Sequence, residues 1–312
     1  MKVWVIALGS YLFRRAIWTV VTIWAILTLT YFVVYLVPSD PARLIAGQHA
    51  SPATLASIRR ALGLYHPLWY RYLVYANQFI HGNLGYDFIM RRPVSGMVLQ
   101  AAPYTFYLAV VAVACELLIG IPIGIIAAVK RYSLVDNVLR FLSILGISMP
   151  TYWVGSILLV IVGFKLGWLP LGGVSPAGVI LPALSVGITG SAFYARILRS
   201  STLETMRMDY VRTARAKGVR EPTVLFKHVI RNSLIPVVTY LGLDLGSLLG
   251  GLIVTEYIFN WSGLGFLLNT ALGQDDGALI MGITLFSATG IVVMNLLVDI
   301  AYAFLDPRVS YS

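Results

Sequence analysis

Charged residues are scarce in this sequence. Asp, Glu, Lys and Arg make up 12% of the 312 residues, whereas a soluble domain carries roughly 25%. Hydrophobic residues make up 58%, and the mean hydropathy is +0.82. Half the usual charge, combined with long apolar runs, excludes an ordinary soluble domain and predicts an all-α integral membrane protein.

Acidic residues are scarcer still. The chain has 13 Asp and Glu against 23 Lys and Arg, which gives a net charge of +10. Such a balance is found in nucleic-acid-binding proteins, but cytoplasmic loops of membrane proteins are also enriched in Lys and Arg. Because the sequence has no DNA- or RNA-binding motif, we expect a lipid bilayer and no nucleic acid as partner.

The residues that hold metals and nucleotides are also few. The single cysteine, Cys115, lies in an apolar run and forms no disulfide within the chain. The histidines, His49, His66, His81 and His228, have no helical pairing and no cysteine companion, so no metal site is expected. No GxxxxGK[ST] string is present, and no nucleophile cluster is visible. We expect neither an enzyme nor a P-loop ATP site in this chain.

Long apolar runs are what the sequence has instead. The first covers residues 16–37, about 33 Å as a helix, which is enough to span a bilayer. A signal peptide would have an apolar core of only about 7–15 residues. Five further spans are expected, at about residues 104–129, 141–164, 179–198, 235–259 and 279–305.

Two of these spans have special residues. The second span is rich in glycine and alanine, which let helices approach closely in lipid. The third contains Pro150, which we expect a continuous span to tolerate because neighbouring helices can satisfy the freed carbonyl.

The spans divide the chain into segments. Residues 1–37 form an N-terminal tail and first span, 38–102 an extracytoplasmic segment, 103–305 a core of five spans, and 306–312 a cytoplasmic tail. In the second segment, Ser51 or Thr54 can cap a helix. A second amphipathic helix is expected over Leu68–Ile80, with the candidate anchors Trp69, Tyr72, Leu73 and Phe79.

The distribution of Lys and Arg predicts the orientation. With both termini inside, 16 of these residues fall in cytoplasmic segments and seven outside. Six of the seven lie in one 65-residue loop, slightly longer than the roughly 60 residues over which the positive-inside rule acts. We therefore expect six spans with both termini in the cytoplasm.

The most informative stretch is the basic segment between the fourth and fifth spans. Residues 196–231 contain nine Lys and Arg against three acids, and the apolar residues Leu203, Met206, Tyr210, Val211 and Ala214 recur at helical spacing. Gly218 interrupts this pattern as a residue just beyond a helix end does, and Glu221-Pro222 can begin the next helix. The pattern predicts a helix–glycine turn–helix with one apolar and one cationic face.

This segment resembles the "EAA" loop of ATP-binding-cassette importer permeases. The strings DYVRTARAKG and HVIRNSLIP resemble, more narrowly, the dipeptide/oligopeptide/nickel permease family, of the type that comes first in its permease pair. HGNLGYDF, NWSGLGFLLNTALGQDD and LDPRVSYS resemble other parts of the same family, so the likeness covers essentially the whole chain. A basic amphipathic helix lying on anionic lipid is the alternative for the segment alone.

The sequence departs from the family pattern at single positions. In the loop, Arg212 stands where glutamate is usual, Thr213 where alanine is usual and Arg231 where proline is usual. Outside it, Asn83 replaces an acid and Ser262 replaces proline. The three loop departures look normal for the oligopeptide branch.

The resemblance implies the type I ABC importer transmembrane fold in a prokaryotic inner membrane, with a small extracytoplasmic subdomain after the first span. It also implies four kinds of partner: a second homologous permease, two cytoplasmic ATPase subunits that hold ATP and Mg, an external solute-binding protein, and the lipid bilayer. In the family, the loop at residues 199–234 docks on the ATPase. The coupling residues are then Asp209, Tyr210, Arg212, Thr213, Ala214, Arg215, Ala216, Lys217 and Gly218.

The cargo and the intramembrane acids leave alternatives open. Relatives carry peptides, oligosaccharides or nickel. Glu116, Asp244 and Glu256 lie in or near spans, where acids mark a translocation pathway or tie helices together. Glu256 is expected close enough to the outer boundary to be hydrated, and Asp299 is expected in inter-helix packing. A stand-alone secondary carrier, which would use these acids as a proton relay, is the remote alternative.

Overall fold

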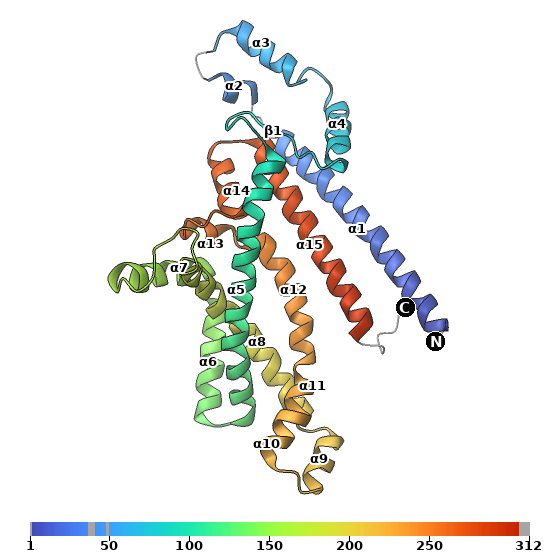
Figure 1. Ribbon diagram of the computed structural model, residues 1–312, viewed down its shortest axis with the longest axis vertical. Helices are drawn as coiled ribbons and strands as arrows, with labels where there is room; N and C mark the ends of the chain where they lie inside the picture. Colours follow the sequence, from blue (N-terminus) through green and yellow to red (C-terminus); the bar gives the residue numbers. More distant parts are fainter. Residues whose placement is uncertain (1, 37–40, 48–49, 306–312) are drawn as a thin grey trace. The chain divides into compact units, whose positions relative to one another are not determined.

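The computed structural model describes residues 2–36, 41–47 and 50–305. The predicted cytoplasmic tail, residues 306–312, lies outside the described residues. The elements are α1 (Lys2–Leu36), α2 (Pro41–Ala46), α3 (Pro52–Ala61), α4 (Leu68–Ile80), β1 (Tyr86–Asp87), β2 (Arg92–Pro93), α5 (Val94–Val129), α6 (Leu134–Ser148), α7 (Thr151–Leu158), the π-helix η1 (Leu159–Lys165), α8 (Ile180–Thr205), α9 (Asp209–Ala216), α10 (Glu221–Thr223), the π-helix η2 (Val224–Ile230), α11 (Arg231–Ser233), α12 (Ile235–Gly251), α13 (Ile253–Ile258), α14 (Leu264–Gly273) and α15 (Gly277–Leu305) (Figure 1). The two strands pair antiparallel, with Tyr86 opposite Pro93.

Five stretches of helix are long and apolar enough to cross a membrane, at Phe13–Tyr35, Val94–Val129, Ile180–Thr205, Glu221–Gly250 and Gly277–Ile300. The pair α6 and α7–η1 passes the same test together but is bent by 101°. The described residues therefore contain up to six crossing segments, as the apolar runs predict.

The bend corrects the prediction of a continuous third span over residues 141–164. α6 ends at Ser148, and Met149 and Pro150 have extended backbones with ψ of 127° and 132°. Proline has no N–H to donate and disfavours the helical conformation of the residue before it. Pro150 instead becomes the N-cap of α7. Proline therefore ends this helix instead of being tolerated within it.

Two other span boundaries also differ from the prediction. α5 begins at Val94, ten residues before the predicted start of the second span. The predicted fifth span, residues 235–259, divides into α12 and α13.

The described residues form two compact units, and unit 1 comprises those that lie within 2–105, 249–253 and 262–305. Within it α1 lies against α15, and Leu27, Tyr31, Met281 and Leu285 form a buried cluster between them. Arg15 and Asp299 form an ion pair of 2.7 Å between the same two helices, as expected for an acid in inter-helix packing. A second cluster joins the start of α5 with α14 and α15.

The segment after α1 folds as short helices and one hairpin. Ser51 caps α3, since its hydroxyl accepts a hydrogen bond of 3.1 Å from the Thr54 N–H. α4 covers the predicted range Leu68–Ile80. Of its candidate anchors, Tyr72 and Phe79 pack against the α1–α15 cluster, whereas Trp69 and Leu73 are exposed.

Two buried aspartates connect the hairpin with the start of α15. The Asp87 carboxylate accepts hydrogen bonds from the N–H groups of Ile89 and Met90, and Asp276 accepts one from Leu279. Both side chains are at least 94% buried, and the two carboxyl groups lie close to each other. Burial and this contact raise the pKa of Asp276 to about 6. The pair therefore holds a proton more tightly than an ordinary aspartate does.

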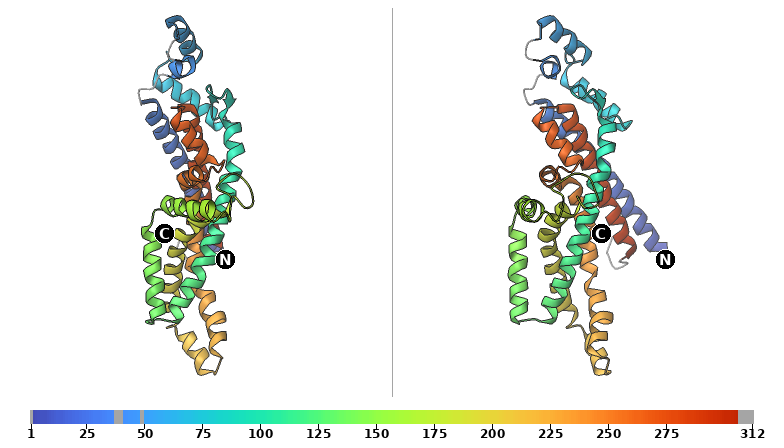
Figure 2. Two further views of the ribbon diagram at one scale, coloured as in Figure 1. Left: turned by 90° about the vertical axis from the view of Figure 1, so that its left-hand side faces the viewer. Right: turned by 60° about the vertical axis from the view of Figure 1, so that its left-hand side comes forward.

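Unit 2 comprises residues 106–248 and 254–261. Its helices α6, α7 and α8 pack together, as the two views in Figure 2 show. α5 approaches α8 at glycines: a Cβ on Gly120 would lie 2.6 Å from the Ser191 carbonyl oxygen, and one on Gly124 2.8 Å from that of Ala195. The predicted role of small residues in the second span is confirmed at these two positions.

A buried ion pair ties α6 to α8. Asp136 is fully buried, and Arg199 donates two hydrogen bonds of 2.8 and 2.9 Å to its two carboxylate oxygens. The Tyr132 N–H donates a third, of 3.0 Å. This fork-to-fork geometry is the strong form of an ion pair and satisfies a charge that would otherwise be costly to bury.

Candidate functional site

The basic segment folds as the sequence predicts, into a helix, a glycine turn and a second helical stretch. α9 ends at Ala216, and Gly218 has a φ of 75°, in the left-handed region that favours glycine. The chain then re-enters helix at Glu221, with Pro222 in its first turn. α10, η2 and α11 follow without interruption and lead into α12.

One face of this segment has its own small core. Val211 and Ala214 from α9 pack against Val224 and Val229 from the second stretch, and all four are buried. Met206, Val219 and Leu225 cover the cluster. The helix–turn–helix is thus a packed unit, in which Ala214 belongs to the inner face.

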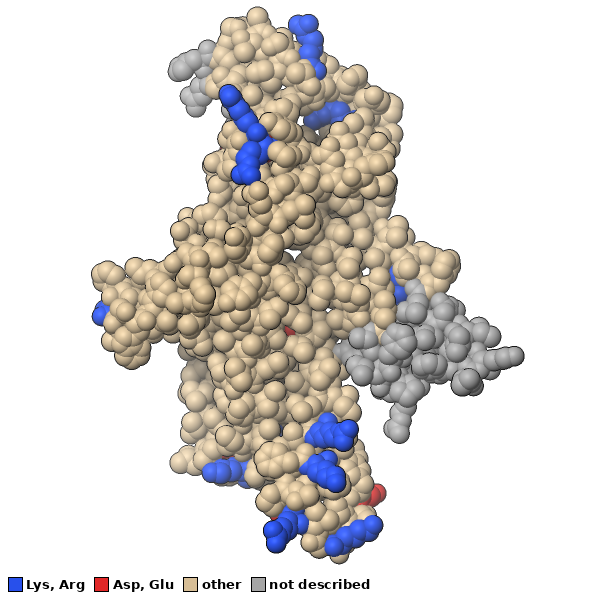
Figure 3. All heavy atoms as spheres, in the orientation of Figure 1, with Lys and Arg blue, Asp and Glu red and all other residues tan. Residues whose placement is uncertain are grey.

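The other face is polar and open. Among the predicted coupling residues, Asp209, Tyr210, Arg212, Thr213, Arg215, Ala216, Lys217 and Gly218 are all exposed. Figure 3 shows Lys and Arg gathered at the end of unit 2 that α9 and α10 form. A Cβ added at Gly218 would meet nothing within 4 Å. This surface therefore offers cationic side chains and a bare turn to a partner.

Two polar contacts hold α9 against the second stretch. Arg215 donates hydrogen bonds of 3.1 and 2.6 Å to the Glu221 carboxylate, and the Asn232 amide donates one of 2.9 Å to the Tyr210 hydroxyl. Arg212 and Asp209 form a loose pair of 3.6 Å on the exposed side. Exposed pairs contribute only about 0–1 kcal/mol each, so the apolar core stabilises the unit more than these contacts do.

A second polar cluster lies inside the helices of unit 2. Glu116 on α5 is 1% exposed, and its carboxyl group lies close to that of Asp244 on α12. The Tyr194 hydroxyl on α8 donates a hydrogen bond of 2.8 Å to the same Asp244. Oε2 of Glu116 is buried without a hydrogen-bond partner. The cluster thus brings two acidic side chains and a tyrosine hydroxyl together inside the helices.

Glu256, the third acid predicted for the pathway, lies on α13 and is fully buried. The expectation that it is hydrated at the outer boundary is therefore wrong. Its position near the end of an apolar run suggested exposure, but Glu256 and the neighbouring Thr255 are both buried.

Sequence reasoning missed the residues that complete this cluster. Gly190 faces Glu116 so closely that a Cβ would lie 1.9 Å from Oε1. Tyr194 follows Gly190 by four residues, so both residues lie on one face of α8. That spacing is a visible signal, but nothing in the sequence indicates that this face meets Glu116.

Long membrane-crossing helices and a basic helix–turn–helix between two of them define the class of protein: a membrane component of a transport system. The family model described as "Binding-protein-dependent transport system inner membrane component" matches residues 120–311, and the model for its N-terminal part matches residues 8–109. The chain belongs to this family and is the permease subunit of an ABC importer.

Curated relatives match along nearly the whole chain. The "Glutathione transport system permease protein GsiC" of Pectobacterium atrosepticum is 39% identical over 303 residues, which cover 97% of this chain and 99% of the relative. The protein of the same name from Escherichia coli is 37% identical over 303 residues, which again cover 97% of this chain and 99% of the relative.

Solved structures confirm the type I importer transmembrane fold. A chain from the inward-facing MetNI methionine ABC transporter has a TM-score of 0.56 at 15% identity and covers 66% of this chain and 96% of its own length. A chain from an amino acid ABC transporter solved with histidines has a TM-score of 0.53 at 15% identity, with coverage of 68% and 95%.

Proposed function

We propose that this permease carries short peptides of the glutathione class across a prokaryotic inner membrane. The observation that supports this cargo most directly is the 39% identity, over 97% of the chain, to a glutathione transport permease. The division into residues 1–37, 38–102, 103–305 and 306–312, with the coupling loop at 199–234, belongs to the same proposal.

The proposal includes partners. A second related permease completes the pathway, an external solute-binding protein delivers the cargo, and two ATPase subunits on the cytoplasmic face hold ATP and Mg. The exposed residues of α9 and the Gly218 turn dock on an ATPase subunit, because they form the open face of a unit whose other face is packed. Closure of the ATPases then moves α9 and the helices that continue from it.

The intramembrane acids belong to the proposal as well. Glu116 and Asp244 border the pathway, and the buried Oε2 atom of Glu116 offers an acceptor to a cationic group of the cargo or to a neighbouring permease. Glu256 lines the same pathway from α13 when the two permeases assemble.

Reconstitution tests the cargo. The permease pair, the ATPases and the binding protein are placed in proteoliposomes, and ATP-dependent uptake of radiolabelled glutathione and a dipeptide is measured. We expect uptake of at least one of the two, competed by unlabelled peptides. Competition by nickel or an oligosaccharide instead would assign the chain to another branch of the family. Uptake by this chain alone without ATP would overturn the importer mechanism and favour a secondary carrier.

Cysteine labelling tests the orientation. A cysteine in place of Gly82, in the segment after α1, should react with an impermeant thiol reagent in sealed right-side-out cells. A cysteine in place of Arg220, beside the Gly218 turn, should react only after permeabilisation. Reaction of the Arg220 variant in intact cells would contradict the assignment of both termini to the cytoplasm.

A further inference from the structure

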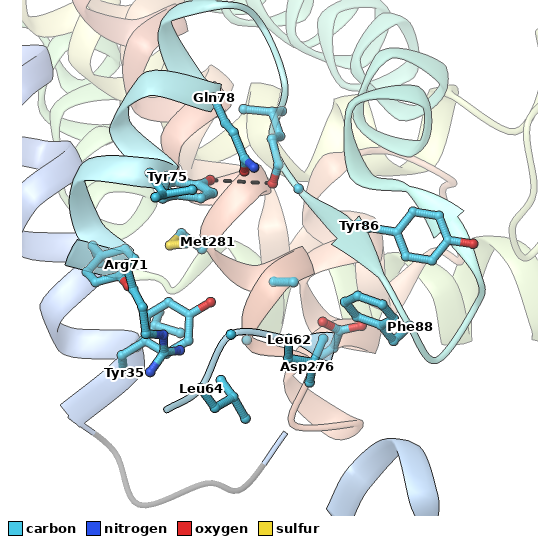
Figure 4. Close-up of a pocket in the computed structure, with 18 of the residues that line it drawn as sticks. Tyr35, Leu62, Leu64, Arg71, Tyr75, Gln78, Tyr86, Phe88, Asp276 and Met281 are labelled. Carbon is cyan, nitrogen blue, oxygen red and sulfur yellow. Dashed lines mark hydrogen bonds between the residues drawn. The ribbon is translucent and has the colours of Figure 1, made fainter. Parts of the chain in front are cut away.

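Unit 1 contains a cavity of about 510 Å³. It is lined by parts of α1, α4, the hairpin and the turn before α15 (Figure 4). Tyr31, Tyr35 and Tyr75 provide aromatic walls, and Met281 lines it from α15. Its volume falls in the range of roughly 300–1,000 Å³ of small-molecule sites, and its lining is aromatic with a few polar groups, as such sites are.

A cation lines one side of this tyrosine cavity. Arg71 on α4 lies with its guanidinium 4.7 Å from the centre of the Tyr35 ring. No acidic side chain of the described residues forms an ion pair with Arg71. Gln78, about two turns further along α4, also lines the cavity, and its amide makes no hydrogen bond within the described part of the chain. Arginine and an amide lining one cavity are suited to a carboxylate.

Acids line another side. Asp275 and Asp276 belong to the turn before α15, and in Figure 4 Asp276 lies across the cavity from Arg71 and Tyr35. The Asp276 carboxylate already interacts with Asp87 and with the Leu279 N–H at the start of α15. The Asp275 side chain is exposed, and it forms no hydrogen bond or ion pair within the described ranges. The cavity thus has an accessible cation on α4 and an accessible acid on the turn.

We propose that the tyrosine cavity binds a small zwitterion, such as a short peptide, with its carboxylate at Arg71 and Gln78 and its ammonium group at Asp275. The aromatic rings pack against the apolar body between the two charges. The inference deepens the proposed function, because it places a second recognition site for the cargo class in the segment after α1.

Calorimetric titration of the assembled complex in nanodiscs, without the binding protein, tests the site. The probes are dialanine, dialanine amide and N-acetyl-dialanine. We expect dialanine to bind at millimolar concentration or better, and each blocked form to bind at least about tenfold more weakly, because each lacks one charge.

Variants test which residue binds the carboxylate of the zwitterion and which binds its ammonium group. Arg71→Gln should weaken dialanine about tenfold and leave the amide unchanged, whereas Asp275→Asn should weaken dialanine and leave the N-acetyl form unchanged. Asp275 has a φ of 53°, a conformation that asparagine tolerates, and its side chain is exposed, so this variant should fold. Arg60→Gln, an exposed position on α3 outside the cavity, makes the same charge change and should have no effect.

Three outcomes would overturn the inference: no binding of dialanine, equal binding of the amide, or equal loss with Arg60→Gln. ATP-driven uptake by the same preparation is measured separately. Normal uptake without cavity binding would reject this site and leave the importer function intact.

Discussion

At the scale of single residues, two arrangements of buried acids are found in the described part of the chain: pairs of carboxyl groups and an ion pair. Asp87 with Asp276 and Glu116 with Asp244 are carboxyl pairs, while Asp136 is held by Arg199. In each case at least one carboxylate oxygen accepts a hydrogen bond from a nearby N–H or O–H group. The two kinds of arrangement respond differently to pH, because a carboxyl pair needs a proton and an ion pair does not.

Asp87→Asn should stabilise the protein above pH 6. Because the pKa of Asp276 is raised when folded, the pair stabilises the fold at low pH, and this contribution is lost as the pH rises through about 6. The amide introduced by the substitution would donate a hydrogen bond to the ionised Asp276 without needing a shared proton. We expect a melting temperature higher by roughly 2–4 °C at pH 8 and no gain at pH 5, measured by thermal unfolding in detergent. A gain that is the same at both pH values would contradict the shared proton.

At the scale of elements, α8 is held on two sides by contacts of different kinds. α5 meets it through glycines that leave no room for a side chain, and α6 meets it through the Asp136–Arg199 pair. Each kind of contact makes its own prediction.

Gly120→Val should loosen the α5–α8 contact. The new Cβ would lie 2.6 Å from the Ser191 oxygen and 2.8 Å from the Tyr194 Cβ, so the helices must separate. Overpacking of this kind costs about 1–3 kcal/mol. Gly290→Val on α15 is the matched control, because a Cβ there meets nothing within 4 Å. Similar thermal stability of the two variants would show that the contact between α5 and α8 is not tight.

Arg199→Ala should destabilise the protein by about 3 kcal/mol, because the fully buried Asp136 loses its two strongest hydrogen bonds and keeps only the Tyr132 N–H and the more distant Arg140, 3.6 Å away. Arg196→Ala, three residues earlier on the same helix and exposed, should change stability by about 0.5 kcal/mol or less. Chemical unfolding of the reconstituted permease measures both. The double variant Arg199→Ala/Asp136→Ala should recover part of the loss, and a purely additive loss would argue against a direct pair.

At the scale of the whole molecule, the proposed coupling to an ATPase depends on a surface that the described residues of the permease leave uncovered. The turn at Gly218 contacts nothing within 4 Å of its would-be Cβ, yet its φ of 75° is one that a residue with a side chain rarely adopts. The bare turn is explained if a partner approaches it.

Gly218→Trp should therefore abolish ATP-driven uptake while the protein still inserts and assembles. Gly167→Trp is the matched control: Gly167 also has a positive φ, 63°, and open space around it, but lies in the loop after η1. The readouts are uptake and the ATPase activity of the complex with and without loaded binding protein. Normal uptake and normal stimulation of hydrolysis in Gly218→Trp would show that the segment lies on lipid and does not couple to an ATPase.

Much of the fold could be predicted from the sequence because its signals are local. Apolar length located the crossing helices, and the glycine and proline of the basic segment located its turn, where φ and the first helical position are local properties. Pro150 was equally visible, but one residue cannot show whether neighbouring helices compensate for a lost hydrogen bond, and here the helix ends.

The polar clusters could not be predicted, because the residues that form them are distant in the sequence. Glu116 and Asp244 lie more than a hundred residues apart in the sequence, and Asp87 and Asp276 are also separated by more than a hundred residues. Glu256 was misplaced because its burial depends on how the break between α12 and α13 directs the chain. Pairing across such separations is set by packing, which periodicity alone does not report.

The close seam between α5 and α8 has a mechanical consequence. α8 has 26 residues, about 39 Å at ~1.5 Å per residue, and α9 follows its end after only three residues. Because α5 contacts its middle closely at Gly120 and Gly124, we expect α8 to resist bending there. If α8 tilts as a rigid rod, a tilt of about 5° moves one end roughly 3 Å relative to the other. We therefore expect a displacement imposed at α9 to be transmitted to the opposite end of α8.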